Sequence, residues 1–371
     1  MKKVLLLPLS WIYGFIISIR NFFYDYKFLK STEFKIPVIS IGNITVGGTG
    51  KTPHTEYLIN ILKQEFDVAS LSRGYKRKTK GFRYVETASS VYETGDEPLQ
   101  IKLKFPEITV AVDADRVNGI NKLLSSEGLH PEPDAIILDD AFQHRSVKPG
   151  INILLIDFNR PITQDHMLPY GRLRESATER SRANFIIITK CPKKIQPITE
   201  RILYKELEIK PYQNLFFTTF DYGKLTPVFK DANIEMVDKW EKEKPTVLLV
   251  TGIASPALLK NHLKPKVRKV LEITYSDHHF YSHSDIQNIQ NNFEAIESSS
   301  KMIVTTEKDM VRLRELDLPE TVRKNLFYIP LVVSFLNNKN QEFDRKILNY
   351  VRENKSNLRL HSKTARPKTV F

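Results

Sequence analysis

Residues 36–52 combine the residue types that bind phosphate. The stretch reads IPVISIGNITVGGTGKT and ends in Gly50, Lys51 and Thr52. Glycines let consecutive backbone N–H groups turn toward phosphate oxygens, and a following helix adds the positive end of its dipole. The lysine then reaches the β- and γ-phosphates, and the threonine hydroxyl faces Mg²⁺. The pattern predicts a nucleotide-phosphate site; the alternative is a glycine-rich structural turn.

The loop departs from the usual phosphate-loop pattern at its start. The first glycine of that pattern falls on Thr45, and the extra glycines lie inside the loop instead. The strand before the loop and the helix after it still favour a phosphate site. The residues that we predict to bind the nucleotide are Thr45, Gly47, Gly48, Thr49, Gly50, Lys51 and Thr52.

An acidic pair follows a second apolar run. Residues 135–138 are apolar, and Asp139 and Asp140 come directly after them. An acidic residue at the end of such a strand helps to hold Mg²⁺ in phosphate-loop enzymes. Two adjacent carboxylates can share a metal only if the strand ends there, because side chains alternate along a strand. We predict magnesium ligands here, with Gln143 and His144 lining the same site; a solvated strand end is the alternative.

Five other polar residues are less specific signals of a functional site. Asp96 lies in a Gly-Asp-Glu-Pro turn, where turn chemistry also explains an aspartate. His278 sits in an Asp-His-His cluster, yet no further ligand at a metal-binding spacing is visible. Arg174 and Glu175 belong to a charged loop that is either solvated or part of a site. Arg116 opens a predicted helix, where its charge is unfavourable unless an anion lies nearby.

Apolar runs alternate with helical stretches along most of the chain. Near-continuous apolar strands between helices indicate a parallel sheet that is covered on both faces. At 371 residues the chain is long enough for two such domains. We therefore predict an α/β fold: a mostly parallel sheet domain of the phosphate-loop NTPase type and a second, smaller α/β domain. The predicted ranges are a membrane-associated helix (1–30), the phosphate-loop domain (31–212), a β-rich linker (213–225), the second domain (226–350) and a basic, flexible tail (351–371).

The N-terminal residues 4–19 are almost wholly apolar, and cations flank them. A bilayer span needs roughly 20 apolar residues, and a signal peptide needs a small-residue cleavage site that is absent here. Trp11, Tyr13 and the flanking cations are typical of a membrane–water interface. We predict a helix that lies in or dips into the cytoplasmic leaflet. A membrane span and a helix packed on the protein's own core are the alternatives.

Charge and cysteine content narrow the function classes. The single cysteine, Cys191, excludes a disulfide framework and a multi-cysteine zinc site, and it fits a reducing compartment. The net charge of +13 is typical of chains that bind nucleic acid, anionic membranes or phosphorylated substrates. Composition alone does not choose among these partners.

A set of short motifs runs in one order along nearly the whole chain: GGTGKTP, SRGY, GDEP, ILDDAFQH, LPYGRLRE, VTGIASP, SDHHFY and TTEKD. Together they resemble the lipid A disaccharide 4'-kinases, the tetraacyldisaccharide kinases of Gram-negative bacteria. Ala141 replaces the glycine of the family's LDDGFQH, a small change that should leave the carboxylates in place. The resemblance implies MgATP-dependent phosphorylation of the 4'-hydroxyl of an acylated disaccharide lipid. It also implies two α/β domains joined by a β-ribbon and an N-terminal membrane helix.

The resemblance also implies roles for individual residues. It makes Lys51 and Thr52 the phosphate and magnesium contacts. Glu175 would lie close to the metal that Asp139 and Asp140 hold. For the transfer itself, the resemblance makes Asp96 the general base on the sugar hydroxyl and His278 of the other domain its partner. It makes Arg116 a contact of the γ-phosphate or the transition state. The residues expected on the substrate side are Tyr75, Gln143, His144 and Arg174. We expect the base and its histidine to meet when the domains close.

Two other functions fit parts of the sequence. A basic phosphate-loop ATPase could use the +13 charge on nucleic acid, but it has no use for an apolar N-terminus, and no nucleic-acid module is recognisable. A membrane-bound nucleotide switch would bind ATP without transferring phosphate. We predict instead a kinase whose partners are ATP, the lipid and the cytoplasmic face of the bacterial inner membrane, without nucleic acid. It would be a peripheral or monotopic protein on the cytoplasmic side.

Overall fold

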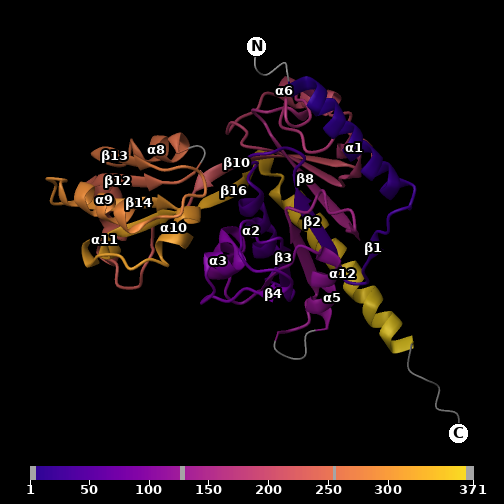
Figure 1. The fold of residues 1–371 in the computed structure, drawn as a ribbon, viewed down its shortest axis with the longest axis horizontal. Coiled ribbons are helices and arrows are strands. Elements are labelled where there is room, and N and C mark those ends of the chain that lie inside the picture. Colours follow the sequence, from indigo (N-terminus) through magenta and orange to yellow (C-terminus); the bar gives the residue numbers. More distant parts are fainter. Residues whose placement is uncertain (1–5, 126–129, 254–255, 365–371) are drawn as a thin grey trace, which may run out of the picture.

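Two mostly parallel β-sheets dominate the computed structural model, which describes residues 6–125, 130–253 and 256–364 (Figure 1). Within these residues the larger sheet has nine strands, in the spatial order β16 (Leu331–Phe335), β10 (Asn214–Tyr222), β9 (Phe185–Thr189), β8 (Ile151–Asp157), β2 (Val38–Gly42), β6 (Ala135–Asp139), β3 (Val68–Ser72), β5 (Thr109–Val112) and β4 (Arg83–Tyr84). The edge strands β16 and β4 run antiparallel to their neighbours, and the strands between them are parallel.

The smaller sheet comes from the C-terminal part of the chain. In the described residues it has five strands, in the order β11 (Thr226–Pro227), β15 (Leu326–Ile329), β14 (Lys301–Thr306), β12 (Thr246–Thr251) and β13 (Lys269–Thr274), with β11 antiparallel. A separate parallel pair consists of β1 (Thr32–Glu33) and β7 (Val147–Lys148). The predicted α/β fold with mostly parallel sheets is confirmed.

Helices connect the strands of both sheets. Those that precede, join or follow strands of the larger sheet are α1 (Leu7–Asp25), α2 (Lys51–Leu62), α3 (Val91–Thr94), α4 (Asp96–Lys104), α5 (Arg116–Leu124), α6 (Pro197–Glu206) and α12 (Asn340–Thr364). Those between strands of the smaller sheet are α7 (Ile234–Glu243), α8 (Ala257–Leu263), α9 (His283–Glu294), α10 (Glu307–Leu313) and α11 (Glu320–Lys324). Short 3-10 turns cover η2 (Ile162–Gln164), η3 (Ala177–Arg182) and η4 (Leu336–Asn338).

The smaller sheet buries both of its faces, as its apolar strands predict. Along β12, Val247 and Leu249 belong to a core cluster with side chains of α7 and α8. The alternate residues, Leu248 and Val250, belong to a second cluster with side chains of α9 and α11. Since successive strand side chains point to opposite faces, this alternation places one helical layer on each side of the sheet.

The chain returns to the larger sheet after the smaller one. Strand β16 pairs with β10, so parts of the ranges predicted as linker and second domain extend the larger sheet. Aromatic packing explains the return. The ring of Phe343 in α12 lies 5.3 Å from that of Phe216 and 4.8 Å from that of Phe335. Figure 1 shows β10 and β16 running between the two sheets.

Helix α12 runs past residue 351, where the flexible tail was predicted to begin. It continues to Thr364, and Val351 is fully buried in the core of the larger sheet. The predicted tail therefore begins inside a helix, because an apolar face continues past residue 350. Residues 365–371 of the tail, residues 1–5 of the predicted N-terminal helix and residues 254–255 of the VTGIASP motif lie outside the described residues.

Helix α1 is attached along one side and exposed along the other. The hydroxyl of Tyr13 donates to the carbonyl of Arg174 at 3.1 Å, and Arg20 pairs with Glu175 at 2.9 Å. The exposed side carries large apolar residues: Leu9, Trp11, Ile12, Phe15, Ile16, Ile19, Phe22 and Phe23. None of the helices in the described ranges is both long and apolar enough to span a membrane.

Helices from both sheets meet at a buried ion cluster. Lys104, the last residue of α4, lies 2.6 Å from Glu56 of α2 and 2.9 Å from Glu307 of α10. Gln100 also donates to Glu56, at 2.7 Å. Burial and then the charge of Glu307 raise the pKa of Glu56. The cluster ties together helices α2, α4 and α10.

Removing the lysine should therefore destabilise the fold. We expect Lys104→Met to lower the free energy of unfolding by about 2 kcal/mol or more, because two buried carboxylates lose the cation between them. Urea denaturation followed by circular dichroism measures the change. The matched control is Lys148→Met, whose partner Glu33 is exposed, and it should cost less than about 1 kcal/mol. Equal stability of the two variants would contradict this account.

Candidate active site

The glycine loop lies between β2 and α2. Gly50 has φ = +88°, and a side chain there would overlap the ring of Phe220, so both conformation and space require glycine. Lys51 and Thr52 are the first two residues of α2. The free N–H groups of this first turn and the positive end of the helix dipole therefore lie at the loop. The strand, glycine turn and helix follow one another as the sequence pattern predicts.

Neighbouring strand ends hold the loop in place. The side chain of Asn43 donates to the hydroxyl of Thr49 at 2.8 Å. The carbonyl of Thr49 accepts from the hydroxyl of Thr189 at 2.9 Å, and the ammonium of Lys190 donates to the carbonyl of Gly48. Gly47 also has a positive φ, +108°. The loop is therefore fixed by the end of β9.

Thr45 lies in a different setting from the glycines. It forms an isolated antiparallel bridge with Leu173, and the N–H of Arg174 donates to the carbonyl of Ile44 at 2.7 Å. This short pairing brings the Arg174 segment of the LPYGRLRE motif beside the glycine loop. Thr45 is thus part of a backbone connection between two motifs.

The acidic pair lies where the chain leaves β6. The strand ends at Asp139, and Asp140 turns the backbone with φ = +48°. Asp139 accepts a hydrogen bond from the hydroxyl of Thr55 at 2.9 Å, and burial raises its pKa. Asp140 lies 3.6 Å from the ammonium of Lys51 and 3.6 Å from the guanidinium of Arg174. Strand β6 therefore ends at Asp139, which is the condition for Asp139 and Asp140 to share a metal ion.

The residues at this strand end fit Mg²⁺ bound together with a nucleotide. Oδ1 of Asp140 is buried without a hydrogen-bond partner, and such an oxygen is a hard ligand of the kind Mg²⁺ prefers. Within the described ranges, no group of three or more His, Cys, Asp and Glu residues is arranged to hold a metal. In nucleotide sites Mg²⁺ binds one or two carboxylates, several waters and the phosphates, so the two aspartates fit such an ion.

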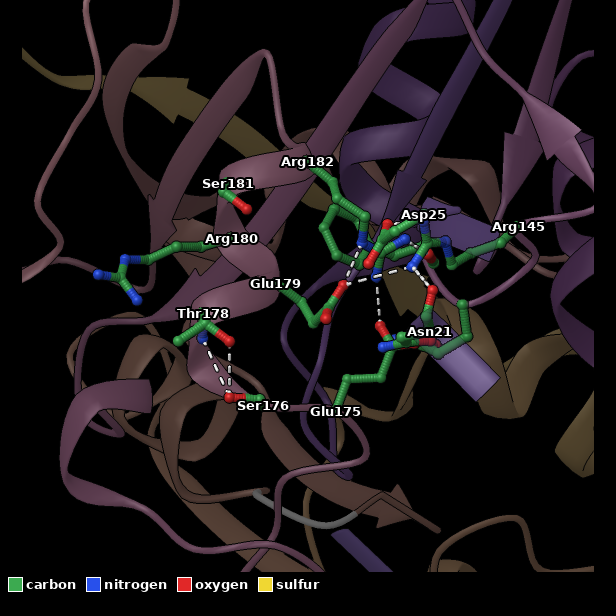
Figure 2. Close-up of polar contacts among 12 residues, drawn as sticks. Asn21, Asp25, Arg145, Glu175, Ser176, Thr178, Glu179, Arg180, Ser181 and Arg182 are labelled. Carbon is green, nitrogen blue, oxygen red and sulfur yellow. Dashed lines mark hydrogen bonds and ion pairs between the residues drawn. The ribbon is translucent and has the colours of Figure 1, made fainter. Parts of the chain in front are cut away.

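Glu175 belongs to an ion-pair cluster that attaches α1. Its side chain is only 1% exposed; Oε1 lies 2.9 Å from Arg20, and Oε2 accepts from Arg182. Burial raises its pKa, which the two arginines oppose. Figure 2 shows Glu175 next to Arg182 and Asn21. The structure thus places this predicted metal residue in a structural contact in which both oxygens already pair with arginines.

A buried arginine lies behind the acidic pair. Arg116 is 1% exposed, its Nε has no partner, and one guanidinium nitrogen reaches the carbonyl of Asp139 at 3.5 Å. Burial lowers its pKa to about 10, so it stays charged. Burial and the charge of Arg116 lower the pKa of His144 to about 4, and that ring is neutral near pH 7. Gln143 donates to the carbonyl of Asn43 at 2.6 Å. These residues place a positive charge and neutral polar groups beside the acidic pair and Asn43.

Two glycine turns place Asp96 and Tyr75 together. Gly74 and Gly95 have φ of +69° and +91°, and a side chain on Gly74 would lie 2.7 Å from the carbonyl of Thr94. The SRGY and GDEP turns can pack this closely only because both positions are glycine. Asp96 is then the first residue of α4 and is buried, whereas Tyr75 is exposed.

Asp96 meets a histidine from the turn that follows β13 of the smaller sheet. Nδ1 of His278 lies 2.9 Å from Oδ2 of Asp96, and Nε2 lies 2.8 Å from the ammonium of Lys308. An ammonium group only donates, so Nε2 accepts and Nδ1–H donates to the carboxylate. The ring of Tyr75 lies 5.7 Å from that of His278. The structure therefore brings together the two residues that the resemblance pairs.

Comparison with known proteins decides the family. The sequence model of the family described as Tetraacyldisaccharide-1-P 4'-kinase (LpxK) matches residues 2–352. The chain belongs to this family. A Tetraacyldisaccharide 4'-kinase of Phocaeicola vulgatus is 50% identical over 353 residues, which cover 95% of this chain and 96% of that protein. One of Bacteroides thetaiotaomicron is 46% identical over 360 residues, covering 95% and 94%.

A solved structure of the tetraacyldisaccharide 4'-kinase family has the same fold. The crystal structure of LpxK from Aquifex aeolicus in complex with ATP superposes with a TM-score of 0.72 at 28% identity. The match covers 95% of this chain and 99% of that chain. The match confirms that the chain has the α/β fold of this kinase family over nearly its whole length.

Two cations of α10 lie at this site but were not predicted from the sequence. Lys308 belongs to the TTEKD motif and contacts His278, and Arg312, one helical turn later, donates to Oδ2 of Asp96. Burial alone would raise the pKa of Asp96, but the hydrogen bond from His278 and the charges of Arg312 and Lys308 lower it to about 2. Residues one turn apart share a helix face, so the motif lysine could have pointed to the arginine.

Proposed function

We propose that the protein is an ATP-dependent kinase that transfers the γ-phosphate of ATP to the 4'-hydroxyl of a tetraacylated glucosamine disaccharide lipid, a step of lipid A biosynthesis. The observation that carries this function is the hydrogen bond of 2.9 Å between Asp96 and His278 in a chain that also has a glycine loop and belongs to this kinase family. The loop provides the phosphate-donor side. The carboxylate and the imidazole provide the acceptor side.

The donor side works by positioning and charge. The N–H groups of the glycine loop and the ammonium of Lys51 bind the β- and γ-phosphates, and Arg116 adds positive charge next to Asp139. When bound, Mg²⁺ supplies charge to the phosphate oxygens, and Thr52, Asp139 and Asp140 are the residues that would hold it. Preorganised charges of this kind cost no reorganisation as charge moves to the leaving group.

The acceptor side needs a base within reach of the sugar hydroxyl. Asp96 takes the proton while the 4'-oxygen forms its bond to the γ-phosphorus, the bond from that phosphorus to the β–γ bridging oxygen breaks, and ADP leaves. His278 holds the carboxylate through Nδ1–H. A weakly basic carboxylate suffices, because a loose phosphoryl-transfer transition state asks mainly for alignment. We assign Tyr75, Gln143, His144 and Arg174 to the lipid's sugar side.

The two sheets correspond to a two-domain layout. We infer that the larger sheet with α2, α4 and α12 forms the kinase domain, and that the smaller sheet forms a second domain. Strands β10 and β16 make the connection between them. Closure of such domains around the substrates would exclude water and limit ATP hydrolysis.

The exposed apolar face of helix α1 supports a peripheral location of the protein at the cytoplasmic face of the inner membrane. Trp11 and Phe15 are 72% and 67% exposed, and the face they share carries other large apolar residues. An apolar helix face of this kind inserts into the boundary between head groups and acyl chains. We infer that the helix keeps the enzyme where its acylated substrate resides.

Charges on this face should release the protein from lipid. We expect the double variant Trp11→Glu/Phe15→Glu to bind anionic vesicles roughly tenfold more weakly or worse, because two large apolar side chains no longer enter the bilayer. Sedimentation with vesicles measures the bound fraction. The control is Ile234→Glu, at an apolar position of α7 that is 60% exposed. A double variant that sediments like this control would contradict the role of α1.

Radiolabel transfer tests the proposed activity. The protein is incubated with [γ-³²P]ATP, Mg²⁺ and tetraacyldisaccharide lipid, and the lipid is separated by thin-layer chromatography. Label on the lipid, lost on phosphatase treatment, is the expected result. ATP hydrolysis without lipid labelling would overturn the kinase function in favour of a nucleotide switch. Hydrolysis that is stimulated by DNA or RNA but not by lipid would overturn it in favour of the nucleic-acid ATPase.

A further inference from the structure

We propose that Arg312 is a positioning residue for the phosphoryl transfer: it holds the Asp96 carboxylate so that Oδ1 is the oxygen that meets the sugar hydroxyl. The proposal rests on the proposed kinase function, in which Asp96 is the base. Arg312 lies on α10, whereas Asp96 begins α4. The contact therefore crosses between the two sheets, as the contact of His278 does.

Both donors bind the same oxygen of Asp96. Nδ1 of His278 lies 2.9 Å from Oδ2, and Nη2 of Arg312 donates to Oδ2 as well. Nη2 and Nδ1 lie 3.0 Å apart because they share this acceptor. In the described residues Oδ1 accepts no hydrogen bond. Two donors on one oxygen leave the other as the free acceptor for a substrate hydroxyl.

The guanidinium of Arg312 is held in place on its other sides. Its side chain is only 4% exposed, and the ring of Phe280 lies 5.9 Å from its central carbon. Asp309, which is fully buried, lies 3.7 Å from Nη1. Asp309 is itself fixed by the N–H of Gly252 at 2.9 Å. Arg312 cannot turn into solvent without breaking this packing.

Stability alone is a poor explanation of this arginine. Its Nε and Nη1 are buried without hydrogen-bond partners, and buried donors that stay unpaired cost free energy. A buried ion pair often contributes no more to stability than apolar residues of the same volume. The arrangement is better explained by its effect on Asp96. Arg312 keeps that carboxylate charged in a buried site and oriented by two fixed donors.

Removal of the guanidinium tests the proposal. We expect Arg312→Ala to lower kcat for lipid phosphorylation by roughly 10- to 100-fold, the scale of one hydrogen bond to a charged group, with KM for ATP unchanged. Guanidinium ion, added at concentrations that do not unfold the protein, should restore part of the lost kcat. Arg312→Lys should retain an intermediate kcat, because an ammonium still donates to the carboxylate but lacks the planar fork.

The control is the next arginine of the same segment. Arg314 follows directly after α10 and is exposed, so Arg314→Ala should keep kcat with and without guanidinium. An unchanged kcat of Arg312→Ala, or a changed KM for ATP alone, would overturn the role of Arg312 while the kinase function stands. Loss of kcat in both Arg312 variants without any rescue by guanidinium would also overturn it. Absence of lipid labelling by the wild-type protein would overturn the kinase function itself.

Discussion

Replacing Asp96 with asparagine is expected to lower kcat for lipid phosphorylation by roughly 10²–10⁴-fold, the range for loss of a general base. The amide keeps the size of the side chain but cannot take the proton of the sugar hydroxyl. Binding of ATP should remain unchanged, since the glycine loop and Lys51 lie on other elements. Steady-state kinetics with the lipid and calorimetric titration with an ATP analogue measure the two effects.

A matched variant separates this effect from a general loss of carboxylate charge. Asp231 lies on the surface of the same protein and pairs with Arg323 at 2.7 Å, with both side chains more than 40% exposed. Asp231→Asn should keep the wild-type kcat. If Asp96→Asn also kept it, Asp96 would not be the base. A loss of ATP binding in Asp96→Asn would show that the residue acts on the donor side instead.

Lys51→Met is expected to lower kcat/KM for ATP by roughly 10²–10³-fold, because one preorganised cation is lost from the transferring phosphate. The ammonium lies 3.6 Å from the carboxylate of Asp140, so it lies beside the acidic pair at the end of β6. Kinetics with varied ATP at saturating lipid measure the change.

The control for this variant lies at the other end of the same helix. Lys63 follows α2 and pairs with Glu107 at 2.6 Å, away from the loop. Lys63→Met should stay within a few-fold of the wild-type kcat/KM. If Lys51→Met were as active as this control, the glycine loop would not be the site that binds the transferring phosphate.

The arrangement of the proposed donor side could be predicted from the sequence because its residues follow local rules. A glycine loop between an apolar strand and a helix, and an acidic pair after another apolar strand, each lie at a strand's carboxyl end. The carboxyl ends of parallel strands lie at one edge of a sheet, and Lys51 and Asp140 meet there because β2 and β6 are neighbouring strands. The resemblance supplied the pairing of Asp96 with His278, which no local pattern contains.

The rest could not be predicted because it depends on long-range contacts. Strand β16 lies in the larger sheet only because it pairs with β10, and its own residues do not show which sheet it joins. The sequence around Glu175 does not show that Arg20, which is far away along the chain, pairs with its side chain. Arg312 contacts Asp96 only because α10 packs against α4. Local periodicity carries no information on such partners.

The most direct test of a site shared by the two sheets is a double-mutant cycle of Asp96→Asn and His278→Ala, measured by single-turnover lipid phosphorylation. Residues that act as one unit have effects that do not multiply. We predict that the double variant is about as slow as the slower single variant, within a few-fold. Losses that multiply across the two positions would contradict the account, because Asp96 and His278 would then act independently.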